Sequence, residues 1–240
     1  MKKLIIGMVC VCFMGGLVAQ AGIITGSFTT DGAVQTWNLT EMGEGDWAYW
    51  DTSANPASGT PTNEKDGGAM IGSMAADGGV SLRGTSSSYT TADFTFTDGA
   101  AILSGAADNL SGLFNSTLAN GKGLSLGIDL PTTDTYRLYI WTSAYNCAGQ
   151  MTISLDGAAD YVHAKANINS KPSWLYTVDV QADNAGDDVT IQYLTTASTG
   201  GSPHALISAV GVSVVPEPAT FGLFAICGGG ILFIRRRMLI

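Results

Sequence analysis

Aromatic side chains beside carboxylates are the residues of this chain whose spacing most clearly suggests chemistry. Trp47, Tyr49 and Trp50 lie within four residues and are flanked by Asp46 and Asp51. A sugar-binding site needs a flat aromatic face, against which the C–H face of a pyranose packs, and polar groups for the hydroxyls. The segment therefore contains the residue types of a glycan-binding platform.

Two more aromatic residues, Trp141 and Tyr145, stand where a predicted strand ends and its loop begins. Asn55, Asn146 and Arg137 are further polar residues that would reach the hydroxyls of a bound sugar, together with Asp46 and Asp51. The candidate glycan-binding rings are thus Trp47, Tyr49, Trp50, Trp141 and Tyr145.

The alternative for every one of these rings is packing in a sandwich core. Side chains alternate between the two faces of a strand, so Trp47 and Tyr49 point to one face and Trp50 to the other. If only one face is buried, at least one of the three lies outside the core. A single aromatic ring is more often packed in the core than exposed for binding. From the sequence alone, both core packing and a sugar-binding platform stay open.

Signatures of catalysis are scarce. His163 and His204 each lie among small or apolar residues, without metal-ligand spacing, and no nucleophile elbow or zinc-protease motif occurs. Two carboxylates for glycoside hydrolysis need no fixed spacing, so a glycan hydrolase or lyase stays a third alternative. The run from Asp183 to Asp188 lacks the register of a calcium loop, which favours a solvated turn. We expect no enzyme, no cofactor and no metal site.

The C-terminal residues form a separate, tripartite pattern. Pro216-Glu217-Pro218 precedes an apolar stretch from Ala219 to Ile234, and Arg235-Arg236-Arg237 follows it. The stretch would span about 24 Å as a helix, slightly less than a hydrocarbon core of about 30 Å. The two prolines keep the approach extended and exposed, as a processing enzyme requires. The arginines predict a cytoplasmic C-terminus by the positive-inside rule.

This tail resembles a PEP-CTERM sorting signal, by which many Gram-negative bacteria route proteins through an exosortase to the cell surface or extracellular matrix. The resemblance covers residues 215 to 237 and implies that an exosortase recognises Pro216, Glu217 and Pro218. It also implies a transient inner-membrane anchor at 219–234 and a structural role alongside exopolysaccharide. The alternative is an ordinary single-pass anchor behind a proline-containing linker.

The N-terminus has the pattern of a secretory signal peptide. Lys2 and Lys3 form the basic region, residues 4–18 the apolar region, and Ala19-Gln20-Ala21 a cleavage site before Gly22. We therefore expect residues 1–21 to be removed; an uncleaved N-terminal anchor is the alternative. The predicted domains are a signal peptide at 1–21, an exported body at 22–214 and the sorting region at 215–240.

The body is strongly acidic. The two ends contain five of the 11 basic residues and one of the 20 acidic residues, so the body has 19 acidic and six basic residues, a net charge of −13. This charge disfavours nucleic acid and simple charge attraction to an anionic polysaccharide. A neutral glycan is compatible with it. Cys147 is the one cysteine of the body, so it has no partner there for a disulfide.

Apolar residues of the body recur with a period of two, which is typical of strands with one buried face. Turn residues separate these runs, and no segment has convincing helical periodicity. We therefore predict an all-β body, a single antiparallel β-sandwich similar in architecture to the jelly-roll, galactose-binding-like class. The predicted strands lie at 35–39, 46–51, 93–97, 124–130, 136–140, 151–155, 174–180, 189–193 and 206–214. Residues 52–68 are predicted as a long loop and 109–118 as a short helix or turn.

Three functions fit these observations. The first is a non-catalytic surface or matrix protein, which the resemblance implies, with an exosortase as its processing partner. The second is a surface-displayed carbohydrate-binding module, and an exposed aromatic pair in a groove would favour it. The third is a secreted glycan hydrolase or lyase, which would need two carboxylates about 5 to 10 Å apart in a cleft.

The basic end of the tail generates a test of its topology. Replacement of Arg235, Arg236 and Arg237 by neutral residues should impair membrane orientation or retention before processing, because the positive charges hold the C-terminus in the cytoplasm. Protease accessibility of the C-terminus in spheroplasts measures this orientation. Correct topology in the neutral variant would contradict the positive-inside prediction.

Overall fold

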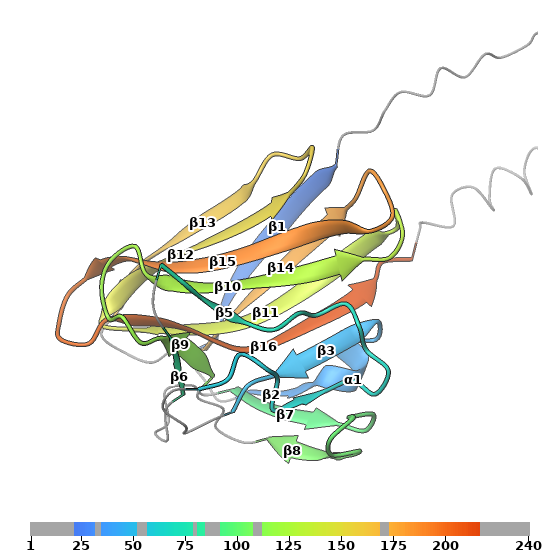
Figure 1. Ribbon diagram of the computed structural model, residues 1–240, viewed down its shortest axis with the longest axis horizontal. Coiled ribbons are helices and arrows are strands. Elements are labelled where there is room, and N and C mark those ends of the chain that lie inside the picture. The colour runs from blue at the N-terminus through green and yellow to red at the C-terminus, as the bar shows by residue number, and fades with distance from the viewer. Residues whose placement is uncertain are drawn as a thin grey trace, which may run out of the picture.

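The computed structural model describes an almost entirely β-stranded protein (Figure 1). The residues that it describes are 22–31, 35–51, 57–78, 81–84, 92–107, 112–168 and 173–216. Several predicted features lie outside these residues. They are the signal peptide with Ala19 and Ala21, the motif residues Glu217 and Pro218, the span at 219–234, and Arg235–Arg237. Within the described part of the chain, no helix is long and apolar enough to cross a membrane.

The larger of two facing sheets contains both ends of the described chain. Its strand order is β1–β14–β11–β16–β3–β4, with β9 also pairing with β16 and β6 with β9. The strands are β1 (Ile23–Asp31), β14 (Ser173–Gln181), β11 (Thr135–Tyr145), β16 (His204–Val214), β3 (Asp46–Tyr49), β4 (Asn63–Glu64), β6 (Leu82–Gly84) and β9 (Leu113–Asn115).

The second sheet has five strands in the order β13–β12–β15–β10–β5. These are β13 (Tyr161–Ile168), β12 (Cys147–Leu155), β15 (Asp187–Ser198), β10 (Gly123–Leu130) and β5 (Ala75–Asp77). All strand pairs in the two sheets are antiparallel across the described residues, which confirms the antiparallel prediction for this part of the body.

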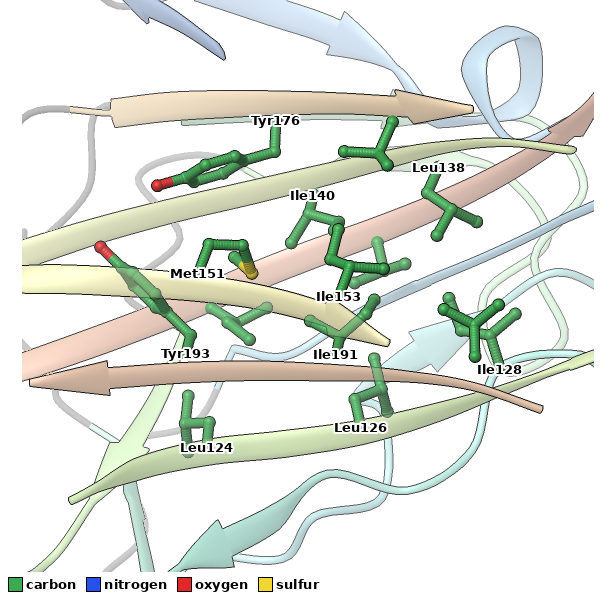
Figure 2. Close-up of a cluster of buried hydrophobic side chains, with 14 of the residues drawn as sticks. Leu124, Leu126, Ile128, Leu138, Ile140, Met151, Ile153, Tyr176, Ile191 and Tyr193 are labelled. Carbon is green, nitrogen blue, oxygen red and sulfur yellow. The ribbon is translucent and has the colours of Figure 1, made fainter. Parts of the chain in front are cut away.

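The main core fills the space between these two sheets. Figure 2 shows its side chains pointing inward from both layers, with Leu138 and Ile140 facing Ile153 and Ile191. These side chains are fully buried, as the period-two pattern of their strands requires. The free Cys147 lies in the same cluster, and burial raises the pKa of its thiol.

A third layer covers the outer face of the larger sheet. It consists of the helix α1 (Leu39–Met42) and a small sheet of β2 (Gln35–Asn38), β7 (Ala92–Phe96) and β8 (Gly105–Ala107). Its strands β2 and β7 are parallel, an exception to the antiparallel prediction. Phe94, Phe96 and Leu39 pack from this layer onto Trp47 and Trp141 of the larger sheet, which forms a second buried cluster. The larger sheet is therefore buried on both faces where the third layer covers it.

The edge strands β1 and β13 meet at one side of the sandwich. The Phe28 ring stacks on His163 at a centroid distance of 4.5 Å, and Lys165 Nζ lies 5.0 Å from the Phe28 centroid. Gly26 faces the Tyr161 ring, which leaves no room for a Cβ. These contacts close the seam between the two sheets.

The structure contains several elements that the periodicity did not predict. The strands β1 and β13 were missed because Gly, Thr and Ala interrupt their apolar pattern, and α1 is too short for helical periodicity. Residues 113–115, predicted as a helix or turn, form the strand β9. The predicted loop at 52–68 contains β4 within its described part.

The assignment of the buried face can be tested with one substitution in the core and a matched control on the neighbouring strand. Ile153→Ala should destabilise the protein by about 2–5 kcal/mol, since Ile153 is fully buried between the sheets. Val162→Ala should change stability by less than about 0.5 kcal/mol, because Val162 on the paired strand β13 is 54% exposed. Urea unfolding measures both, and equal losses would contradict the assignment of the buried face.

Candidate functional site

Four of the five candidate glycan-binding rings are buried. Trp47, Trp50 and Trp141 are at most 1% exposed and Tyr49 is 4% exposed. Trp47 and Tyr49 lie in the cluster under the third layer, whereas Trp50 lies in the core between the two large sheets. None of these four rings presents a face to a sugar, so the core-packing alternative describes them.

Trp47 and Tyr49 of β3 and Trp50, which follows it, alternate between the two faces as predicted, but the conclusion that one of them leaves the core is wrong. That conclusion assumed one solvated face, and the third layer covers the second face. The indole of Trp47 donates from Nε1 to Asp98 at 2.9 Å, and that of Trp50 donates to the Gly59 carbonyl at 2.8 Å. Both buried indoles therefore have the hydrogen-bond partners that their polar ends need.

Two of the polar candidates make contacts with other residues of the protein, Asp46 in the interior and Arg137 at the surface. The Asp46 carboxylate accepts from the backbone N–H groups of Trp47, Met70 and Ile71 at 2.8–3.0 Å. Desolvation raises the pKa of Asp46, although these backbone donors oppose the shift. Arg137 forms a two-pronged ion pair with Asp179 at 2.7 and 2.8 Å, which raises the pKa of the guanidinium.

Three polar candidates remain, and one of them, Asn146, lies in a loop beside Tyr145. Asp51 stays exposed beside the buried Trp50, and partial burial of its carboxyl raises its pKa. Asn55 lies outside the described residues.

Tyr145, the fifth candidate ring, lies at the end of the sandwich opposite the termini and is half-buried. We call this region, which consists of Arg83 and residues 113–123, 145–147 and 199–205, the distal end. The Tyr145 ring lies 5.4 Å from the imidazole of His204, which stacks on Phe114 at 4.5 Å. The guanidinium of Arg83 lies 5.7 Å from the Phe114 centroid. Tyr145, His204, Phe114 and Arg83 form a continuous row across three strand boundaries.

Two loops with unusual backbone conformations brace this row. Asn146 and Ser202, with φ of 52° and 61°, are the non-glycine residues with positive φ in the described part of the chain. Asn146 Nδ2 donates to the Gly201 carbonyl at 2.8 Å, and the Thr199 N–H donates to the Asn146 carbonyl at 3.0 Å. The Ser202 carbonyl lies 2.7 Å from Nδ1 of His204. Strained backbone of this kind persists only where its surroundings hold it, and it clusters at functional sites.

A shallow hollow adjoins the row at the distal end. Its lining includes Asn115, Thr117, Lys122, Thr195 and His204, and it encloses no space large enough for a water molecule. Pockets that enclose a small ligand usually have about 300–1,000 Å³. A ligand at this end would therefore lie across the surface.

Carboxylates do come together elsewhere, on the outer face of the five-stranded sheet. Asp129 and Asp188 stand directly opposite each other on β10 and β15, and a hydrogen bond to Asp129 raises the pKa of Asp188. Both side chains are exposed on an open sheet face, without the enclosing walls of a cleft. Across the described residues, no group of three or more His, Cys, Asp or Glu side chains could hold a metal ion.

The junction with the tail is the other functional region. The strand β16 pairs with β11 as far as Val214, and the Val215 N–H donates to the Thr135 carbonyl at 2.7 Å. Val212 is fully buried, whereas Val214 is 45% exposed and Pro216 is exposed. The chain thus passes from a central strand to an accessible segment within four residues.

A family model describes the segment that begins at this junction. The model for the PEP-CTERM protein-sorting motif matches residues 214–237. The chain carries a PEP-CTERM sorting motif. The resemblance seen in the tail is confirmed, and the PEP-CTERM motif indicates an exported protein with a C-terminal sorting signal.

The body of this PEP-CTERM protein has weaker likenesses. The family 35 carbohydrate-binding module from Clostridium thermocellum is 21% identical with a TM-score of 0.29, over 42% of this chain and 78% of the module. TmCBM61 in complex with β-1,4-galactotriose has 13% identity and a TM-score of 0.30, over 41% and 67%. CBM35 from Cellvibrio japonicus Abf62 has 17% identity and a TM-score of 0.27, over 43% and 77%. These low scores carry no weight for function, and no curated protein matches the sequence.

Three members of the distal row were not identified from the sequence. Phe114 lies in a segment predicted as a helix or turn, His204 was judged only for metal spacing, and Arg83 had no local signal. The four residues of the row are far apart along the chain. Only strand pairing brings them together, so no local spacing could have revealed the row.

The conformation of Asn146 generates a test of the bracing. Asn146→Ala should destabilise the protein by about 1–3 kcal/mol, because it removes the bond to Gly201 and places a Cβ residue without a polar side chain at positive φ. Asn146→Gly also loses the bond but tolerates positive φ, so its loss should be smaller, about 0.5–1.5 kcal/mol. Urea unfolding measures the stability of both variants. A larger loss of stability in Asn146→Gly than in Asn146→Ala would contradict backbone strain at this position.

Proposed function

We propose that this protein is an exported cell-surface or extracellular-matrix protein, processed at Pro216-Glu217-Pro218 by an exosortase. The observation that carries the proposal is the junction at Val214–Pro216, where the matched motif begins as the last strand leaves the sheet. A processing enzyme needs an extended and accessible segment beside a stable body, and this junction has that form. The mature protein acts structurally alongside exopolysaccharide and is non-catalytic.

The non-catalytic role is supported by the positions of the polar groups. The exposed pair Asp129 and Asp188 lies on an open face, and the buried Asp46 is held by backbone donors. His204 is held against the Ser202 carbonyl, and burial raises the pKa of the Cys147 thiol. A secreted glycan hydrolase or lyase is the least supported of the three functions.

Carbohydrate binding by the displayed body is the second candidate function. One observation favours it: the half-buried Tyr145 lies in a row with His204, Phe114 and Arg83, beside two strained and braced loops. Because Phe114 and His204 are each 5% exposed, Tyr145 is the ring of this row that would contact a sugar. We also propose the jelly-roll, galactose-binding-like class for the sandwich, which the two facing antiparallel sheets support.

The sorting function is tested by replacing Pro216, Glu217 and Pro218 with alanine. These residues lie beyond the last pairing of β16, so the body should fold normally while the full-length chain stays in the inner membrane. Intact mass of the protein from the cell surface and the membrane fraction measures the outcome. The unmodified protein should begin at Gly22 and end near residues 215–218.

An exposed proline outside the motif supplies the control. Pro131→Ala, in the turn between β10 and β11, should leave sorting unchanged. Normal release of the triple-alanine variant, or a surface species that still ends at Ile240, would overturn the proposed processing.

A further inference from the structure

Both termini of the body leave from the same end of the larger sheet. Ile23 and Thr135 both pair with Gln181, and Tyr136 pairs with Val214. Three strand spacings of about 4.8 Å place the starts of the two tails about 14 Å apart. In Figure 1 the start of β1 and the end of β16 lie at the same end of the sandwich.

The distal end therefore faces away from the membrane while the predicted anchor holds the protein. β16 has 11 residues and extends from His204 at the distal end to Val214 at the exit. At about 3.4 Å per residue the two ends are about 34 Å apart. The residues between Val214 and the predicted span would allow at most about 18 Å between body and bilayer. The distal end is thus free to meet material outside the cell.

The net charge of the body is unevenly distributed between these ends. Seven aspartates lie on the turns and strand ends where the tails leave: Asp129, Asp134, Asp156, Asp160, Asp183, Asp187 and Asp188. Arg137, the cation nearest the start of β11, is neutralised by Asp179. The expectation that net charge disfavours an anionic partner therefore applies to this end and not to the whole surface.

The distal end presents hydrogen-bond donors and cations. The hollow is lined by Lys122, Asn115 and Thr117 among others, and no carboxylate is among its lining residues. Arg83 is half-buried; its Nε is itself buried, without a hydrogen-bond partner within the described part of the chain, so a ligand would meet the exposed part of the side chain. Asp77, whose backbone carbonyl accepts from Asn115, directs its own carboxylate to Gln192 Nε2. A group with oxygen acceptors and negative charge complements this surface.

We propose that the distal end binds a carboxylated polysaccharide, with Tyr145, Arg83 and Lys122 as its main contacts. The Tyr145 ring packs against the face of a sugar ring, and the two cations pair with ring carboxylates. The planar guanidinium of Arg83 suits a carboxylate particularly well. This inference rests on the proposed role alongside exopolysaccharide and names the chemical class of that glycan.

Affinity electrophoresis of the full chain, purified in mild detergent, tests the proposal. Polygalacturonate in the gel should retard the protein, and the same polymer with methyl-esterified carboxyls should not. Added salt should weaken the retardation, because the contacts are charged. Arg83→Gln and Lys122→Gln should each weaken binding about tenfold, the effect of losing one charge-assisted contact. Tyr145→Leu should also weaken it, through loss of the flat ring.

Lys165→Gln is the matched control, since it removes one positive charge from the edge strand β13, which lies three strands across the five-stranded sheet from β10 and the preceding Lys122. It should bind polygalacturonate like the unmodified protein. Equal retardation by the esterified polymer, no retardation by either polymer, or unchanged binding in Lys122→Gln and Tyr145→Leu would overturn the proposal. The binding is measured before processing, so a failure of sorting and a failure of this inference are distinguished.

Discussion

The strand β16 is paired along both edges, and its residues from His204 to Val212 are buried. This placement depends on two layers of side chains, the main core on one face and the aromatic cluster under the third layer on the other. A central strand cannot be withdrawn without exposing both layers and unpairing two ladders of backbone groups. The sorting motif begins where this strand ends. The chain thus joins a strand that is paired on both edges directly to the PEP-CTERM motif.

The same arrangement explains the division of the molecule into two ends. The antiparallel sheet brings β1, β14, β11 and β16 into one layer, so both tails leave together. Carboxylates gather on the turns at that end, whereas Arg83, Lys122 and the braced loops of Asn146 and Ser202 lie elsewhere. The two tails and the cluster of aspartates therefore lie at one end of the body, and Tyr145 and Lys122 at the other.

Whether the aromatic residues form a binding surface or a core depends on whether one or both faces of their sheet are covered. The run at Trp47, Tyr49 and Trp50 has the composition of a sugar platform, and in the structure it joins two hydrophobic clusters across one strand. Tyr145 has no such local pattern, and it is the ring that stays half-exposed beside other aromatic and cationic groups. The sequence identified aromatic residues of the type that binds sugars. Their burial in the structure shows which of them are core residues and which reach the surface.

The sequence alone determined the all-β class, most of the long strands and the sorting motif, because period-two patterning and a tripartite tail are local properties of the chain. It did not predict β1 or β13, since Gly, Thr and Ala weaken their patterns. It predicted strands at β2 and β7 but not their stacking as a third layer, because that layer is held by contacts with distant strands. Only the tertiary structure decided that Trp47 is buried and that Arg83, Phe114, His204 and Tyr145 meet. The physical reason is that burial and proximity between distant residues depend on how layers stack and strands pair.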